Sequence, residues 1–335
     1  MRTIGLTLAS LLILPAVLIR IDQRHSGARA QQKIEDDAGQ PIKIDVDVVN
    51  LYCAVRNKQN ALLSNLEKSD FSLAEDGVPQ IIKYFTRETD LPLTIGLLVD
   101  VSGSQQNLIE PERRAASSFF SSVLKKKDVA FLISFGADSE LLQDITGSPR
   151  VLQDGLNRLK LNGGFAGING GPVPTANKPR GTVLYDAVYV AANDMLAKEV
   201  GRKAIVLITD GEDQGSRETE KAAIEAAQKA DAIIYGILYV DRQFYDVFGP
   251  GYSGESTLKH MSEETGGRVF HVDRRNPLDS IFDQIQREMR TQYAIGYAPT
   301  NGKKDGSYRK LDLRTVNKDL KVQVRKGYYA MPNAQ

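Results

Sequence analysis

The sequence predicts an α/β protein in which a doubly wound, mostly parallel, Rossmann-like sheet of six strands is inserted into a smaller, discontinuous β-sandwich. Between residues 93 and 290, short apolar runs alternate with segments of helical spacing, which is the element order of a parallel sheet covered by helices. Residues 42–91 and 291–330 instead alternate apolar and polar side chains, as half-buried strands do. The chain is therefore expected to contain one α/β unit flanked by two β segments.

The first 30 residues are expected to be a signal peptide. Arg2 precedes an apolar run at residues 4–19, and Ala28-Arg29-Ala30 has the small residues of a cleavage site. An uncleaved membrane anchor is the alternative, because the polar stretch that follows the apolar run is long. We expect export to the periplasm, the cell surface or the medium, with residues 31–41 as a polar linker.

The overall charge excludes several classes of partner. The 335 residues contain 43 Lys and Arg against 42 Asp and Glu, so no global field favours nucleic acid or an anionic membrane. Contact with a membrane is expected only through an uncleaved signal segment. No G-x-x-x-x-G-K-[ST] motif is present, so no nucleotide is expected.

The single cysteine, Cys53, allows no internal disulfide and is expected to be a packed core residue.

The N-terminal β segment is expected to contain three or four strands. From Ile42 the sequence alternates, with Ile42, Ile44, Val46 and Val48 on one face. Further strands are expected at residues 70–73 and 81–85, joined through a turn that contains Asp76-Gly77.

The inserted unit is expected to begin at residue 92 and end at residue 290. Five buried strands and one antiparallel edge strand alternate with helices. The strands are expected at residues 93–100, 128–136, 141–146 (the edge), 203–210, 231–240 and 267–272. The helices are expected at residues 106–125, 149–160, from Thr182 onward, and at 217–230, 256–264 and 276–290. The long glycine-rich segment 162–181 is expected to be a surface loop.

The C-terminal β segment is expected to form three strands, at residues 292–299, 307–316 and 321–330. A sheet of so few strands rarely buries a face without a partner. We therefore expect the two flanking segments to build one shared sandwich.

Hard oxygen side chains follow the first strand of the inserted unit. Asp100, Ser102 and Ser104 have the spacing D-x-S-x-S, and Gly103 gives the backbone freedom to turn. An oxygen-only set suits Mg²⁺, Mn²⁺ or Ca²⁺, and ligands collect at the carboxyl ends of strands in open α/β sheets. The alternative is that Asp100 and Ser102 only cap the following helix.

Two later stretches complete a recognisable pattern. Thr182 stands at the head of a helix after the glycine-rich loop, and a buried strand ends in Thr209-Asp210-Gly211. D-x-S-x-S, a lone threonine and T-D-G, in that order, resemble the von Willebrand factor type A (vWA) domain. The resemblance implies that Asp100, Ser102, Ser104, Thr182 and Asp210 form a metal-ion-dependent adhesion site (MIDAS). The flanks LEKSDFSLAEDGVPQIIKYF and QYAIGYAP resemble a secreted, vWA-related family of Acidobacteria.

The resemblance also implies a function. Ser102, Ser104 and Thr182 would bind Mg²⁺ (or Mn²⁺ or Ca²⁺) directly, and Asp100 and Asp210 partly through water. An Asp or Glu side chain of a partner protein could then replace a metal-bound water, as in an adhesion-type module. A structural or envelope-assembly component with a structural ion is the alternative.

An enzyme is not expected from the motifs of the sequence, and a hydrolase is the less favoured alternative. No H-E-x-x-H, no G-x-S-x-G and no Cys/His pair occurs. Of the three histidines, His25 lies in the export segment and His260 in an expected helix. His271, in an expected strand, could face the cleft but is expected to be a packed or rim residue.

Overall fold

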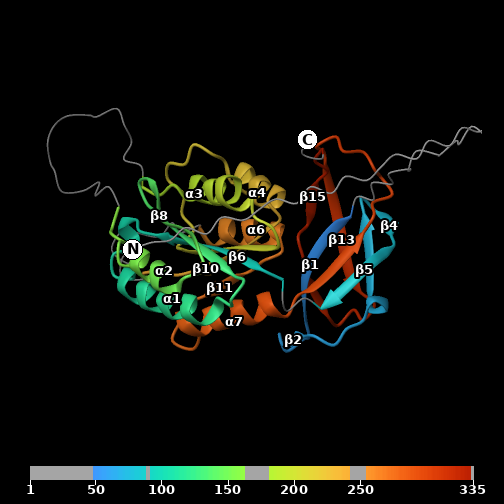
Figure 1. Cartoon of the computed structure of the whole chain (residues 1–335), viewed down its shortest axis with the longest axis horizontal. Helices are drawn as coiled ribbons and strands as arrows, with labels where there is room; N and C mark the ends of the chain where they lie inside the picture. Colours follow the sequence, from blue (N-terminus) through green and yellow to red (C-terminus); the bar gives the residue numbers. More distant parts are fainter. Residues whose placement is uncertain (1–47, 88–90, 163–180, 242–253, 333–335) are drawn as a thin grey trace, which may run out of the picture. The chain divides into compact units, whose positions relative to one another are not determined.

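A six-stranded sheet forms the centre of the α/β unit (Figure 1). Its strand order is β11-β10-β9-β6-β7-β8, and every neighbouring pair is parallel except β7 and β8. The strands are β6 (Leu93–Asp100), β7 (Val129–Phe135), β8 (Ser139–Thr146), β9 (Arg202–Thr209), β10 (Ala232–Leu238) and β11 (Val269–His271). The predicted mostly parallel sheet with an antiparallel edge strand is confirmed.

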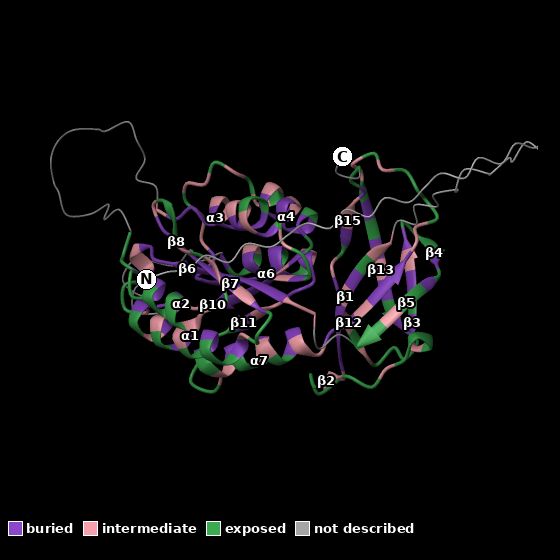
Figure 2. Cartoon of the chain, in the orientation of Figure 1, coloured by how far each residue is buried: buried purple, intermediate pink, exposed green. Residues whose placement is uncertain are grey.

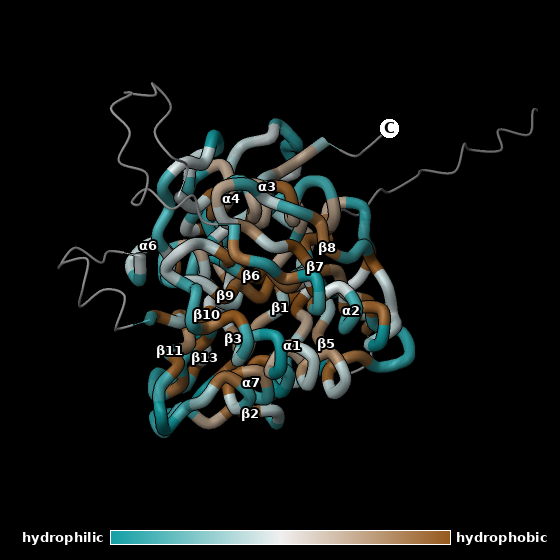
Figure 3. Tube along the Cα trace, turned by 90° about the vertical axis from the view of Figure 1, so that its left-hand side faces the viewer, coloured by the Kyte–Doolittle hydropathy of each residue, from teal (hydrophilic) through white to brown (hydrophobic). Residues whose placement is uncertain are grey.

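Helices cover both faces of this sheet, which explains why all eight residues of β6 are buried (Figure 2). One face packs against α1 (Ile109–Val123), α2 (Pro149–Leu156) and α7 (Leu278–Arg290). The other face packs against α3 (Leu184–Val190), its π-helical continuation η3 (Ala191–Leu196), α4 (Glu220–Lys229) and α6 (Gly254–Thr265). Apolar residues accordingly gather along β6, β7, β9 and β10 (Figure 3).

The computed structural model describes residues 48–87, 91–162, 181–241 and 254–332. All of these described residues belong to one compact unit. The expected signal peptide, the linker, the residues 42–47 and most of the glycine-rich loop lie outside the described residues. Within the described residues, no helix combines the length and the apolar character needed to cross a bilayer.

Several helices are shorter than predicted, and for two of them the local reason is clear. The helix expected from residue 106 begins at Ile109, because Gly103–Gln105 form a separate 3₁₀ turn, η2, that keeps the serines on a tight loop. The helix expected to reach residue 160 ends at Leu156, where the chain tightens into i to i−3 hydrogen bonds.

The flanking segments form two antiparallel sheets with a common apolar core. One sheet has the order β14-β1-β12-β5, with β2 paired to β1, and the other has the order β15-β13-β3-β4. The N-terminal strands are β1 (Val49–Arg56), β2 (Leu62–Leu63), β3 (Phe71–Glu75), β4 (Val78–Gln80) and β5 (Ile82–Arg87). The C-terminal strands are β12 (Tyr293–Tyr297), β13 (Tyr308–Thr315), β14 (Lys321–Gln323) and β15 (Gly327–Tyr329).

Each of these sheets mixes strands from the two ends of the chain. Strand β12 lies between β1 and β5, and β13 lies between β3 and β15. The core includes buried residues from both segments, among them Leu51, Cys53 and Ile295. Cys53 is fully buried, and burial raises the pKa of its thiol, as expected for a packed residue. The domain boundaries themselves stay a prediction.

Two predictions within the flanks are wrong. The turn between the expected strands 70–73 and 81–85 is only Asp76-Gly77, both with positive φ, and the next residues form β4, which pairs back on β3. The strand expected at 321–330 splits into β14 and β15, which pair with β1 and β13 in different sheets. A tertiary hydrogen bond accompanies this break, because the N–H of Lys326 donates to the backbone carbonyl of Glu264 in α6 (3.1 Å).

Candidate metal site

Asp100 and Asp210 lie at the ends of neighbouring parallel strands, so their loops leave the same edge of the sheet, here called the carboxyl edge. The backbone N–H of Ser102 donates to Asp100 Oδ1 (2.9 Å), and Thr209 Oγ1 donates to Asp100 Oδ2 (2.6 Å). Both oxygens of this fully buried carboxylate are therefore fixed by groups of the two strand ends.

The two serines connect the strand ends. Ser102 Oγ and Ser104 Oγ lie 3.0 Å apart, and Ser104 Oγ donates to Asp210 Oδ2 (2.5 Å). The N–H of Glu212 donates to Asp210 Oδ1 (3.1 Å). The structure thus brings Asp100, Ser102, Ser104 and Asp210 together in one hydrogen-bonded cluster.

Thr182 reaches this region through the backbone. Its carbonyl accepts from the N–H of Gln214 (2.9 Å), and the N–H of Gly181 donates to the carbonyl of Gln214 (3.4 Å). These bonds hold the buried Thr182, at the head of α3, against the loop that follows Asp210. Thr182 is therefore connected to the other four residues by the backbone of that loop rather than by its hydroxyl.

The helix-capping alternative is wrong for Asp100 and Ser102. The N-cap of α1 is Leu108, and Ser102 precedes the short turn η2 without a side-chain capping hydrogen bond. The oxygens of these two residues instead face the cluster at the carboxyl edge.

Two further polar residues of the cluster were not predicted from the sequence. Gln105 Nε2 donates to Asp210 Oδ2 (3.2 Å) and to the carbonyl of Tyr239 (3.3 Å). Glu112 of α1 is fully buried. Among the described residues, neither oxygen of Glu112 nor Gln105 Oε1 has a hydrogen-bond partner. The signal for Glu112 was its spacing, because position 112 falls on the same helix face as Ile109, Ala116 and Val123, which are apolar.

The electrostatics of the cluster are unfavourable without a counter-charge. Burial, with the neighbouring charge of Asp210, raises the pKa of Asp100 to about 7. Burial, with the charges of Asp100 and Asp210, raises the pKa of Glu112 well above its usual range. Three acidic groups share a region of low dielectric, where a cation or a proton relieves their repulsion.

The residues present fit a hard divalent cation. All candidate ligand atoms are oxygens, as Mg²⁺, Mn²⁺ and Ca²⁺ prefer. The side-chain oxygens of Glu112 and Gln105 Oε1 accept no hydrogen bond from a described residue, and a nearby cation would stabilise them. No group of three or more Asp, Glu, His or Cys with metal-binding geometry occurs among the described residues. Serine and threonine hydroxyls would therefore have to complete the ligand set.

A cleft of about 660 Å³ opens at the ends of β10 and β11, on the same edge of the sheet. Leu108, Asp241 and Arg275 are among its lining residues. Asn107 Nδ2, from the segment that follows the metal-site loop, donates to Asp241 Oδ2 (2.7 Å). This bond connects the candidate metal site to the wall of the cleft.

No family model and no curated protein matches the chain. Among solved structures, proximal thread matrix protein 1 (PTMP1) from the mussel byssus gives a TM-score of 0.46 at 13% identity, over 64% of this chain and 51% of that one. Another PTMP1 structure has a zinc-occupied MIDAS motif. BatB from Bacteroides thetaiotaomicron gives a TM-score of 0.41 at 20% sequence identity, over 60% of this chain and 97% of BatB. The vWF domain of the pilus tip protein Mfa5 from Porphyromonas gingivalis gives a TM-score of 0.44 at 13% sequence identity, over 60% of this chain and 96% of that domain. The chain spans about half the length of PTMP1.

Proposed function

We propose that this protein is an exported, adhesion-type binding module that captures an acidic group of a partner protein through a divalent cation at a MIDAS-like site. One observation carries the proposal. Hydroxyl and carboxylate oxygens from two neighbouring strand ends converge within hydrogen-bond distance, with Ser104 bonded to both Ser102 and Asp210. A bound Mg²⁺, Mn²⁺ or Ca²⁺ would supply an electrophilic centre for a carboxylate of the partner.

The chain's own residues would hold and orient this centre. Asp100 and Asp210 provide the negative charge, and Ser102, Ser104 and Thr182 provide neutral oxygens. Because hydroxyls donate weakly, an incoming Asp or Glu would strengthen the coordination. Thr209 fixes the orientation of Asp100, and Gln105 that of Asp210.

Export is part of the same proposal. It rests on the apolar segment 4–19 that follows Arg2 and on the Ala28-Arg29-Ala30 series, all outside the described residues. The mature chain should begin near Gln31, and intact mass spectrometry of the processed protein tests this. A full-length chain recovered from the cytoplasm would contradict it.

A structural ion is the second candidate function, because Asp100 and Asp210 are almost fully buried, with exposed fractions of 0% and 1%. The two candidates differ in what the cation touches. In an adhesion site one coordination position faces the partner, whereas a structural ion is enclosed by the chain. We propose no hydrolase activity in either case.

Water proton relaxation with Mn²⁺ in place of Mg²⁺ separates the two candidates. We expect the bound Mn²⁺ to enhance relaxation, because metal-bound water would exchange with solvent. A short peptide containing Asp or Glu should lower the enhancement, and the matched Asn or Gln peptide should not. Asp100→Ala should remove Mn²⁺ binding altogether.

Two results would contradict the adhesion proposal. Bound Mn²⁺ without enhancement would show an enclosed, structural ion. Binding of a partner protein that survives EDTA, or that survives neutralisation of every acidic residue on the partner's contact surface, would show that the metal is not the bridge.

A further inference from the structure

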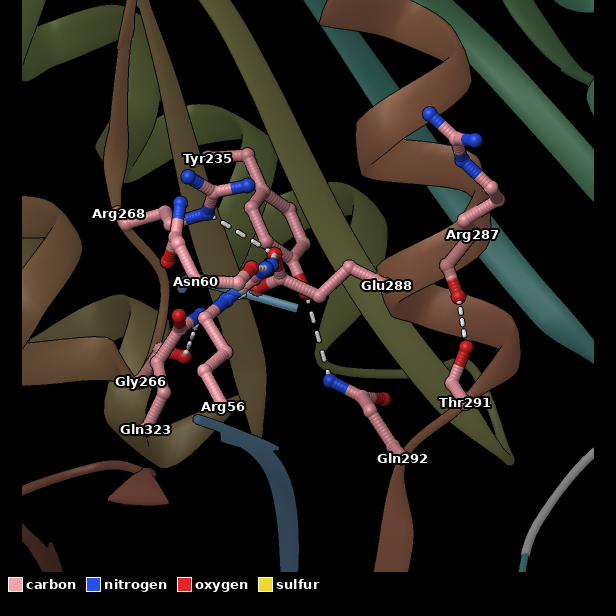
Figure 4. Close-up of polar contacts among 10 residues, drawn as sticks. All are labelled: Arg56, Asn60, Tyr235, Gly266, Arg268, Arg287, Glu288, Thr291, Gln292 and Gln323. Carbon is pink, nitrogen blue, oxygen red and sulfur yellow. Dashed lines mark hydrogen bonds and ion pairs between the residues drawn. The ribbon is translucent and has the colours of Figure 1, made fainter. Parts of the chain in front are cut away.

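We propose that a second site, the cavity bounded by Arg56, Arg268 and Arg287, binds the oxyanion of a small phosphorylated or sulfated molecule. This cavity, here called the arginine pocket, has a volume of about 330 Å³. It lies between the turn that follows β1, at Asn60, and the helix α7. Figure 4 shows Arg56 and Arg268 beside the carboxylate of Glu288, and Arg287 farther along the same helix, α7.

The arginine pocket carries more positive charge than the chain neutralises. Glu288 is fully buried, and its Oε2 accepts from Arg56 Nη2 and from Arg268 Nε (3.0 Å). The other oxygen, Oε1, accepts from Gln323 Nε2. Two guanidinium groups therefore share one carboxylate, and Arg287 adds a third cation to the lining.

Several guanidinium donors in the arginine pocket lack acceptors. Arg56 Nε is buried without a hydrogen-bond partner among the described residues. Arg268 uses its Nε for Glu288, and no described residue accepts from its two terminal nitrogens. Partial burial lowers the pKa of Arg268, which is the direction expected when a cation loses part of its hydration. An oxyanion in the cavity would accept charge-assisted hydrogen bonds from the terminal nitrogens of Arg268 and from Arg287, both of which line it.

The two inner arginines are held in place before any ligand binds. Arg56 Nη1 donates to the carbonyl of Asn60 (2.9 Å), and the guanidinium of Arg268 lies 3.9 Å from the centre of the Phe270 ring. Arg287 is exposed and projects from α7 on the other side of the view in Figure 4. Preorganised donors reduce the entropic cost of binding.

The size of the arginine pocket indicates more than a free ion. Small-molecule sites begin at about 300 Å³, which is far more than one phosphate or sulfate group fills. The ion pairs with Glu288 account for the packing of Arg56 and Arg268, but they leave the cavity and the exposed Arg287 without a role. A phosphate or sulfate ester would account for the cavity and for Arg287 as well, if its oxyanion binds the arginines and its remaining atoms fill the cavity.

Isothermal titration at fixed ionic strength tests the proposal with inorganic phosphate, sulfate, glucose 6-phosphate and, as the uncharged control, glucose. We expect both free anions and the sugar phosphate to bind, and glucose not to bind. Arg287→Gln should weaken binding at least tenfold without a change in Tm, because the side chain is exposed. Arg150→Gln, an exposed arginine on α2, is the matched control and should bind as the wild type does.

Comparing glucose 6-phosphate with inorganic phosphate shows whether the arginine pocket binds an ester or a free ion. Tighter binding of glucose 6-phosphate than of phosphate supports an ester ligand, and equal binding supports the oxyanion site but assigns it to the free ion. No binding of any anion overturns the proposal, as does equal binding by Arg287→Gln and wild type. The inference is independent of the metal site, so EDTA should leave anion binding unchanged.

Discussion

The chain buries carboxylates in two places and treats them in opposite ways. Glu288, at the end of α7, is fully buried and is paired with two guanidinium groups and an amide. Asp100 and Glu112, near the carboxyl edge, are also fully buried, yet neither forms an ion pair with a described residue. The buried carboxylate therefore has positive counter-charges at one place, whereas at the other the described residues supply none.

This difference distinguishes a carboxylate that stabilises the fold from carboxylates that are available to bind a cation. A buried charge without a partner costs several kcal/mol, so a fold retains it where something else provides compensation. At Glu288 the chain provides its own cations. At the carboxyl edge no described residue forms an ion pair with Asp100 or Glu112, and burial with the charges of neighbouring carboxylates raises the pKa of both.

The largest effect is expected for Glu288→Ala, which leaves the buried Arg56 and the half-buried Arg268 without their shared carboxylate. We expect a loss of about 3–5 kcal/mol in the free energy of unfolding, measured by urea denaturation in EDTA. Glu110→Ala is the control, because the ion pair of Glu110 with Arg113 is exposed and should contribute less than about 1 kcal/mol. Equal losses in the two variants would remove the distinction between the two kinds of carboxylate.

Asp100→Asn should act in the opposite sense. The amide can still accept from the N–H of Ser102, and it removes a charge from an acidic cluster, so stability without metal should hold or rise. The affinity for Mg²⁺ should fall at least a hundredfold, about 2.7 kcal/mol. Calorimetry with Mg²⁺ and thermal unfolding in EDTA measure the two parts, and unchanged Mg²⁺ affinity would refute the metal site.

Glu112→Gln sharpens the comparison, because Glu112 was found from the structure alone. If its buried charge serves the cation, the substitution should weaken Mg²⁺ binding about tenfold, or about 1.4 kcal/mol. Stability in EDTA should not fall, since neither oxygen of Glu112 has a described partner to lose. Glu110→Gln, on the exposed side of α1, should change neither quantity, and a fall in stability with unchanged affinity would assign Glu112 to packing.

Thr182→Ala should have the smallest effect. Its backbone bonds to Gln214 remain, and only one neutral oxygen is lost, so we expect Mg²⁺ affinity to fall a few-fold, less than about 1.4 kcal/mol. Capture of an acidic partner should suffer more than folding does. A hydroxyl-retaining Thr182→Ser variant should restore binding, and failure to do so would show that the methyl group matters instead.

Much of the fold could be predicted from the sequence because its signals are local. The strand at Leu93–Asp100 is continuously apolar, and the alternation of such runs with helical spacing specifies a parallel sheet. The alternation in KVQVRKGYYA stops at Val324, where β14 has already ended, so the sequence carried a weak signal for the break between β14 and β15. The pairing of the two strands in different sheets could not be predicted, because it depends on tertiary contacts such as the hydrogen bond from Lys326 N–H to the carbonyl of Glu264 in α6.

The candidate site divides in the same way. Asp100, Ser102 and Ser104 are neighbours in the sequence, so their spacing alone indicated a cluster. Glu112 lies on a helix whose buried face is otherwise largely apolar, and only the packing of α1 on the sheet reveals its position beside Asp100. The pairing of Glu288 with Arg56 joins residues 232 positions apart, which no local pattern indicates.

The mixing of N-terminal and C-terminal strands in the two small sheets has a consequence for how the chain folds. Tyr293 Oη donates to the carbonyl of Leu63, 230 residues earlier, and Tyr293 pairs with Arg87 in the register of β5 and β12. Contacts of such long range form slowly from an open chain, because the intervening loop must close first. Once the α/β unit has folded, the two flanking segments are separated only by the distance between the first and last residues of that unit, so less loop-closure entropy is lost when they pair. We therefore expect the inserted unit to fold first and to act as the template on which the sandwich closes.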